Sequence, residues 1–190
     1  MYTETMEMKP QDVLVALRLA LLPGGGRPAY ATLASDLGMS ASETHASIKR
    51  LRAARLVGDV DSQLRVNRLA LLEFVIHGVK YAFPPDRGTL TRGMPTGYAA
   101  PPLNAVIVGG SDPPPVWPDA EGTARGLALS PLCRYAPAAA KKNDALYQVL
   151  ALIDALRDGR ARERQFAKKE LEIRLGYPAS ERTTDAQPES

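Results

Sequence analysis

The sequence holds little of what several large classes of protein require. A single cysteine, Cys133, among 190 residues excludes a disulfide framework and a cysteine-based zinc finger. No apolar run approaches the roughly 20 residues needed to cross a bilayer. The opening residues, MYTETMEMKP, lack the basic and apolar regions of a secretory signal. We therefore expect a cytoplasmic protein with no membrane segment.

Residue types that commonly carry catalysis are also scarce. His45 and His77 are the only histidines. Cys133 stands beside Arg134, and a neighbouring cation lowers a thiol pKa, but no third group that would orient a Cys–His pair lies nearby. We interpret Cys133 as a buried, inert thiol. No spacing of His, Cys and carboxylates resembles a zinc site, so we expect no enzyme activity, no metal and no cofactor.

Proline is distributed unevenly and divides the chain. Of 16 prolines, 11 fall between residues 83 and 142, together with seven of the 15 glycines. The flanking segments have the apolar spacing of helices. The predicted organisation is an N-terminal domain at 8–82, a Pro/Gly-rich middle at 83–142, a C-terminal helical segment at 143–176 and a polar tail at 177–190.

Two short helices are predicted after a first helix that begins near Pro10. Leu33, Ala34 and Leu37 give the earlier one an apolar face, and Gly38 then ends it. Ser40 stands at the N-cap position of the next helix, with Glu43 three residues later completing a capping box. Two helices joined by a short turn that contains glycine form a helix-turn-helix.

The residues of this segment match a known pattern. The run ATLASDLGMS at 31–40, followed by IKRL at 48–51 and ARLV at 54–57, resembles the helix-turn-helix of winged-helix bacterial regulators of the MarR-like kind. Arg55 stands where that family usually has Gly, which predicts a less tightly bent corner. Ala46 stands where many members have a basic residue, which predicts an altered mode of base contact. The resemblance implies a winged-helix fold and DNA binding.

A β wing is predicted directly after the second helix of this motif. Residues 56–60 and 63–66 can pair as short strands around the turn formers Asp61 and Ser62. A helix follows, capped by Asn67, and the resemblance implies that it packs on the domain or on a second protomer. We expect a mainly α fold, with an N-terminal winged helix-turn-helix, a Pro/Gly-rich arm and C-terminal helices. The apolar stripe of the helix after the wing comprises Leu69, Leu72, Val75, Ile76 and Val79.

Residues 41–55 are the candidate recognition helix for the major groove of duplex DNA. A helix is about 10–12 Å wide with its side chains, and the groove is about 12 Å wide. Glu43 can accept from cytosine and His45 can donate to guanine, whereas Lys49, Arg50 and Arg52 suit phosphates, and Arg65 at the wing suits the backbone or minor groove. The candidate DNA-binding residues are Ser40, Ser42, Glu43, His45, Ser47, Lys49, Arg50, Arg52 and Arg65.

The weak net charge of +3 hides this local concentration of basic groups. Residues 1–82 carry 10 basic and 8 acidic groups, residues 83–142 carry 6 and 4, and residues 143–190 carry 8 and 9. The helix at 41–55 alone carries four basic groups and one acidic group. The distribution favours a small DNA footprint over general coating of nucleic acid. The alternatives are a solvated helix face or a protein-binding module.

Two alternatives remain for the middle segment: an ordered arm or a flexible linker. Its apolar runs, such as LNAVIV at 103–108, favour the arm, and Trp117 is the candidate anchor. Residues 116–118 and 123–129 are predicted to form a hairpin around an acidic turn. After it, the helix from Asn143 carries an apolar stripe that either docks inside the chain or forms a dimer seam. That stripe comprises Leu146, Val149, Leu150, Ile153 and Leu156.

These patterns together favour a sequence-specific, duplex-DNA-binding transcriptional regulator that acts as a homodimer. The alternative is a protein-interaction module, such as an autoregulatory antitoxin that binds a protein partner through the arm and the C-terminal helices. The middle segment can also line a pocket for a small effector, although no motif specifies a ligand.

Overall fold

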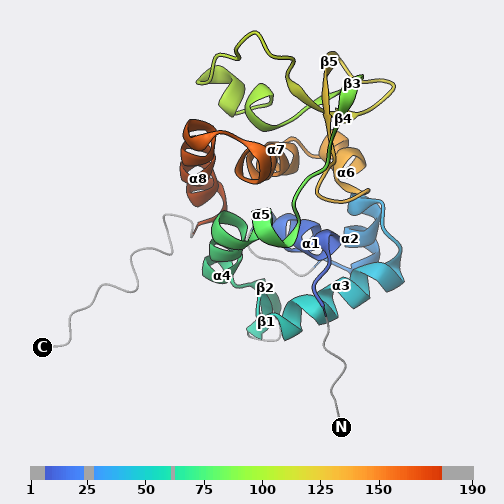
Figure 1. The fold of residues 1–190 in the computed structure, drawn as a ribbon. Helices are drawn as coiled ribbons and strands as arrows, with labels where there is room; N and C mark the ends of the chain where they lie inside the picture. The colour runs from blue at the N-terminus through green and yellow to red at the C-terminus, as the bar shows by residue number, and fades with distance from the viewer. Residues whose placement is uncertain (1–6, 24–27, 61–62, 177–190) are drawn as a thin grey trace, which may run out of the picture.

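The computed structural model describes residues 7–23, 28–60 and 63–176, and the fold is mainly α with some β (Figure 1). Three N-terminal helices lie at one end of the molecule, and strands from the middle of the chain lie at the other. Helices from the C-terminal part lie between these two ends. The predicted polar tail at 177–190 lies outside the described residues.

Helix α1 (Pro10–Ala20) is the centre of the N-terminal part. Its apolar side chains are almost completely buried, with Val13, Leu14 and Leu17 all at 0% exposure. Helices α2 (Tyr30–Leu37) and α3 (Ala41–Ala53) pack beside it. Gly38 ends α2 in the left-handed conformation, with φ of 67°. The predicted glycine stop and the capping box at the start of α3 are both confirmed.

The corner after α3 is tightly bent although it holds an arginine. Arg55 adopts φ of 59°, the left-handed conformation that glycine adopts without strain. The expected looser corner is therefore wrong. A residue with a Cβ atom in this conformation costs roughly 1–2 kcal/mol. Strands β1 (Val57–Val60) and β2 (Gln63–Val66) follow and pair antiparallel, and their predicted turn at 61–62 lies outside the described residues.

The next helical stretch contains a wide turn that changes which side chains face the core. Helix α4 (Arg68–Glu73) runs into a π-helical turn, η2 (Phe74–Gly78), and then into α5 (Val79–Ala82). Leu71, Val75 and Val79 are fully buried, whereas Leu69 is 61% exposed. The predicted inward position of Leu69 is wrong. The buried side chains are Leu71, Val75 and Val79, which are four residues apart, and Leu69 does not belong to this row.

The middle segment forms a small, tightly coiled sheet. Its strands are β3 (Arg87–Pro95), β4 (Pro115–Pro118) and β5 (Ala124–Leu129), with two 3₁₀ turns between β3 and β4. Both later strands pair antiparallel with β3, and they consequently run parallel to each other. The predicted hairpin is therefore wrong. The segment contains paired strands where the sequence left an ordered arm and a flexible linker as alternatives. The 3₁₀ turns are η3 (Gly97–Ala99) and η4 (Leu103–Ala105).

Glycines permit the close crossings of this sheet. A Cβ atom at Gly93 would lie 2.1 Å from the backbone oxygen of Trp117, and one at Gly126 would lie 1.9 Å from that of Pro114. Neither distance is possible between unbonded atoms. The glycine content that the sequence shows in this segment thus has a structural cause at these two positions.

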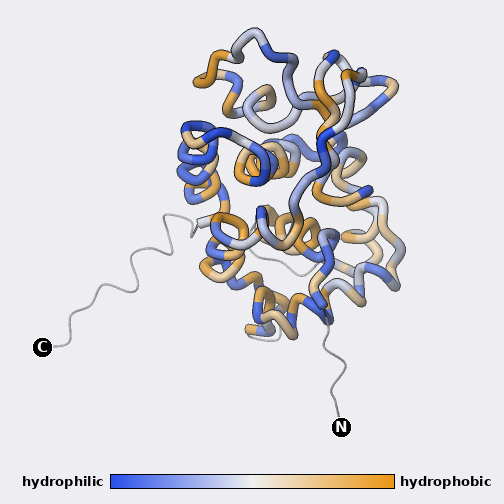
Figure 2. The backbone as a smooth tube through the Cα atoms, in the orientation of Figure 1, coloured by the Kyte–Doolittle hydropathy of each residue, from blue (hydrophilic) through white to orange (hydrophobic). Residues whose placement is uncertain are grey.

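The C-terminal helices join all parts of the chain into one core. Helices α6 (Ala136–Lys142), α7 (Asp144–Asp158) and α8 (Ala161–Leu175) follow the sheet. The stripe of α7 is buried inside the chain, as the docking alternative predicts. In Figure 2, α1 and α7 are largely hydrophobic, whereas α8 is mostly hydrophilic. Among the described residues, no helix has the length and apolarity to cross a bilayer.

A buried polar network fastens the sheet to α7. Asp154, 1% exposed, accepts hydrogen bonds from Thr96 Oγ1 at 2.7 Å and from Trp117 Nε1 at 2.6 Å. It also forms an ion pair with Arg157 at 2.6 Å. Burial raises the pKa of Asp154, while Arg157 and the two hydrogen bonds oppose that rise. Trp117 therefore anchors the middle segment, as expected, through a partner that sequence spacing does not reveal.

We predict that Gly126→Ala lowers the free energy of unfolding by about 1–3 kcal/mol, because the added methyl group overlaps the backbone of Pro114. The control is Gly110→Ala, whose Cβ atom meets nothing within 4 Å. It should change that free energy by less than about 0.5 kcal/mol. Urea denaturation followed by the emission of Trp117 measures both variants. Equal midpoints would contradict the close crossing.

Candidate nucleic-acid interface

Helix α3 presents one row of side chains to solvent. Ser42, His45 and Lys49 are all exposed, at the i, i+3 and i+7 spacing of a single helix face. Lys49 forms no ion pair with any residue that the structure describes. The His45 ring lies edge-on to the ring of Tyr30 on α2, with centroids 5.6 Å apart, so that α2 supports this face.

The opposite face of α3 belongs to the core, and this corrects one candidate. Thr44, Ser47, Ile48 and Leu51 are buried against the rest of the chain. Ser47, which the sequence places among the base-contacting residues, is 0% exposed and accepts a hydrogen bond from Arg50. A side chain in this position cannot reach a base edge.

Arg50 is held inside the protein rather than offered to phosphates. Its guanidinium binds both carboxylate oxygens of Asp12 on α1, through Nε at 2.7 Å and a terminal nitrogen at 2.6 Å. Asp12 is fully buried and only 14% of the Arg50 side chain is exposed. The Asp12 carboxylate raises the pKa of Arg50. Arg50 therefore leaves the set of candidate DNA contacts, because Asp12 would otherwise be a buried, unpaired charge.

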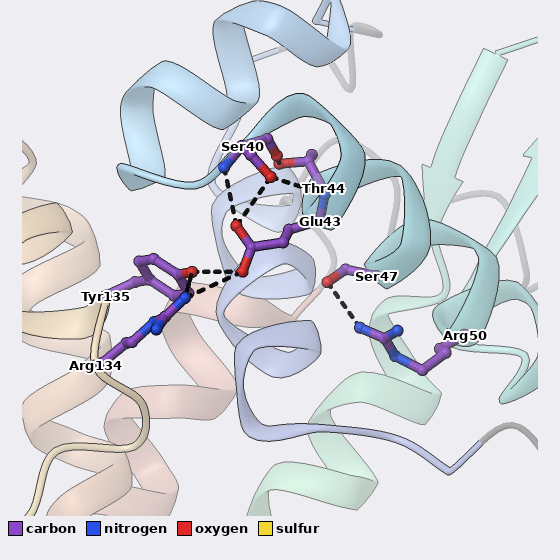
Figure 3. Close-up of polar contacts among 7 residues, drawn as sticks. All are labelled: Ser40, Glu43, Thr44, Ser47, Arg50, Arg134 and Tyr135. Atoms are coloured by element: carbon purple, nitrogen blue, oxygen red, sulfur yellow. Dashed lines mark hydrogen bonds and ion pairs between the residues drawn. The ribbon is translucent and has the colours of Figure 1, made fainter.

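The segment before α6 contacts the N-terminal end of α3 (Figure 3). Glu43 Oε1 accepts a hydrogen bond from Tyr135 Oη at 2.6 Å and pairs with Arg134 at 3.2 Å. Glu43 Oε2 accepts from the backbone N–H and the hydroxyl of Ser40. Both oxygens of Glu43 are thus occupied, and Ser40 is engaged in the cap. We remove Glu43 and Ser40 from the candidate base contacts.

These contacts favour the ionised form of the Glu43 carboxyl group. The hydrogen bond from Tyr135, and those from Ser40 after it, lower the pKa of Glu43 from 4.5 to about 2. The carboxylate is therefore ionised at neutral pH and is compensated by Arg134, whose side chain is 76% exposed. Arg134 and Tyr135 were missed by sequence reasoning, because they are some 90 residues from Glu43 along the chain.

The β1–β2 pair lies beside the C-terminal half of α3 (Figure 1). Arg52 forms an ion pair with Asp59 on β1 at 3.0 Å and keeps 37% of its side chain exposed. On β2, Arg65 donates to the Gln63 side chain at 3.1 Å. Arg55 at the corner is exposed and, among the described residues, forms no ion pair. Basic groups therefore border the exposed row of α3 on this side.

The remaining reactive groups form no centre of their own. Cys133 is partly buried, and this burial raises the pKa of its thiol to about 11, which makes thiolate chemistry unfavourable at neutral pH. His77 is exposed on η2, far from Cys133 in sequence and on another element. In the parts of the chain that the structure describes, no three His, Cys, Asp or Glu residues are grouped so that they could hold a metal ion.

Comparisons with known proteins give no match for this chain, whether against protein-family models, curated proteins or solved structures.

The ion pair of Arg50 predicts a difference between two adjacent basic residues. Arg50→Ala should lower the free energy of unfolding by about 3 kcal/mol, because it leaves Asp12 buried and unpaired. Lys49→Ala, on the exposed face, should change it by less than about 0.5 kcal/mol. The double variant Asp12→Asn with Arg50→Ala should lose less free energy of unfolding than the two single variants lose together. Additive losses in urea denaturation would argue against the pair.

The contact between Glu43 and Tyr135 predicts a shifted titration. Because the folded-state pKa of Glu43 is lowered, its stabilising contacts are complete above pH 4.5 and are lost as the pH falls through about 2. Tyr135→Phe should move the pKa of Glu43 upward, towards 4.5. Carboxyl ¹³C NMR measures this pKa, and Tyr81→Phe, at an exposed site, serves as the control. An unchanged Glu43 pKa in Tyr135→Phe would refute the assignment.

Proposed function

We propose that residues 8–82 form a winged helix-turn-helix and that the protein is a sequence-specific, duplex-DNA-binding transcriptional regulator. In this proposal α3 is the recognition helix and the β1–β2 pair is the wing. The observation that carries it is the exposed row of Ser42, His45 and Lys49, bordered by basic side chains at the end of α3 and on β2.

The dimensions of this surface suit a groove. Helix α3 has 13 residues, which at 1.5 Å per residue gives a length of about 20 Å. Ser42 and His45 are short polar groups that reach base edges when the helix lies in a major groove, and Lys49 further along reaches a phosphate. The interface is narrower than the sequence suggests, because Ser47 and Arg50 face inward and Glu43 is occupied.

Basic residues at the edges of the row complete the proposed footprint. Arg52 pairs with Asp59 and keeps 37% of its side chain exposed, and Arg55 and Arg65 lie at the corner and on the wing. These positions suit backbone contacts, since phosphate contacts fix the orientation of a protein without reading sequence. Arg134 adds a cation at the other end of α3, next to Glu43.

The alternative of an antitoxin-like partner module receives less support. It requires an arm and C-terminal helices that are free to take a partner, whereas β3–β5 and α7 pack on each other and on the N-terminal part. The proposed homodimer also loses the α7 stripe as its seam. Oligomeric state is therefore a separate measurement, made by light scattering with and without DNA.

The test begins with selection of duplex sequences from a random pool. The affinity for the best sequence, measured by fluorescence anisotropy at rising KCl, should fall steeply as counterions return to the phosphates. Lys49→Ala should reduce the slope of log affinity against log salt by about 1, as expected for one lost phosphate contact. His45→Ala should relax the preference for one base position in a repeated selection.

Lys168→Ala on α8 is the matched control, because Lys168 is half-exposed and makes only a 3.9 Å ion pair with Glu172. It should leave the affinity and the salt slope unchanged. If no sequence is enriched, or if Lys49→Ala and His45→Ala both bind like Lys168→Ala, α3 is not a recognition helix and the proposed function fails.

A further inference from the structure

A cavity of about 550 Å³ lies between the coiled sheet, the segment after η3 and the corner where α7 meets α8. The strands that line it lie at the opposite end of the molecule from α3 (Figure 1). Its volume falls within the range of pockets that hold small organic ligands. No residue of the proposed DNA interface lines it.

One wall of the cavity is apolar and partly open to solvent. Val108 is 96% exposed and Leu127 is 44% exposed, and both line the cavity together with the half-buried Ile107. Large apolar side chains gathered at an open hollow are typical of a surface that covers an apolar group of a ligand.

Another part of the lining carries charges, and two of its three arginines are paired with carboxylates of the protein. Arg87 donates to Asp158 at 2.7 Å, and Arg160 donates to Asp112 at 3.0 Å. Arg162 on α8 is the third arginine of the lining. Its guanidinium carbon lies 5.7 Å from the centroid of the Phe166 ring. An anionic ligand would have to displace a protein carboxylate at Arg87 or Arg160, whereas Arg162 forms no ion pair among the described residues.

Glu163 is the carboxylate that remains without a cation. It accepts the backbone N–H of Arg160 at 3.1 Å as part of the α8 cap, and among the described residues it forms no ion pair. The C-terminal end of α7 and the N-terminal end of α8 both line the cavity at this corner, and their helix dipoles have opposite signs there.

Tyr98 lies where the charged and apolar walls meet, with its ring against Gly109. Burial raises the pKa of Tyr98, and the negative charges of Glu163 and Asp112 raise it further against the opposing effect of Arg160. The phenol ring therefore lies near two carboxylates, of which Asp112 is paired with Arg160 and Glu163 is not paired among the described residues. An aromatic face beside carboxylates is the arrangement that binds ammonium groups.

We infer that this cavity is a binding site for a small amphipathic amine, with its ammonium group between Tyr98 and Glu163 and its apolar body against Ile107 and Leu127. The site is separate from the proposed DNA interface and does not depend on the proposed function. Three matched probes test the chemistry: 2-phenylethylammonium, the neutral 2-phenylethanol and the anionic phenylacetate.

The assay uses the full chain without DNA. Trp117 is the only tryptophan, and its indole donates to Asp154, which lines the cavity, so its emission can report binding alongside calorimetry. The ammonium probe should bind roughly tenfold more tightly than the alcohol, and phenylacetate more weakly still. Tighter binding of phenylacetate, equal binding of all three probes, or no binding of the ammonium probe overturns the inference.

Charge-neutral variants locate the site. Glu163→Gln keeps the α8 cap, since glutamine can replace glutamate at this position, but removes the charge. It should weaken binding of the ammonium probe roughly tenfold and leave the alcohol unaffected. Glu172→Gln on the same helix is the control and should bind like the wild type. Should Glu163→Gln fail to fold, Asp112→Asn at the surface decides instead, and unchanged ammonium binding there overturns the inference.

Discussion

The pair formed by Arg50 and Asp12 determines which way α3 faces. Two short hydrogen bonds join a guanidinium on α3 to a fully buried carboxylate on α1, and neither group can leave without exposing the other to an apolar interior. With Arg50 directed inward, the helical period of 3.6 residues directs Ser42, His45 and Lys49 outward. The polar pair, together with the buried face of Thr44, Ile48 and Leu51, therefore selects the surface that α3 presents.

Local features of the fold were predictable from the sequence because their causes are local. The capping box of Ser40 and Glu43, the glycine stop at Gly38 and the strand pair after α3 all depend on residues within a few positions of one another. The corner at Arg55 shows the limit of such reasoning. There the surrounding helix and strand impose a left-handed conformation on a residue that does not favour it.

The candidate site was only half predictable, because the charge of a side chain does not reveal its partner. Arg50 and Lys49 are adjacent and both carry a positive charge, yet one is bound to Asp12, 38 residues earlier, and the other is exposed. Glu43 likewise meets Tyr135 from a segment 92 residues away. The predicted hairpin of the middle segment was wrong for a similar reason. Strands β4 and β5 each pair antiparallel with β3, so the turn between them does not set their relative direction.

The middle segment connects the two ends of the molecule through one continuous run of chain. Leu127 and Leu129 on β5 line the cavity, and only a few residues later Arg134 and Tyr135 bind Glu43 at the start of α3. Between them, the backbone oxygen of Ser130 accepts from Arg157 at 3.3 Å, which fastens the run to the buried network around Asp154. This connection would let a ligand in the cavity regulate α3 only if the segment has two positions and the ligand binds more tightly to one of them. Because the run is anchored in the core at its centre, a shift of β5 would have to move the Asp154 network before it reached Glu43.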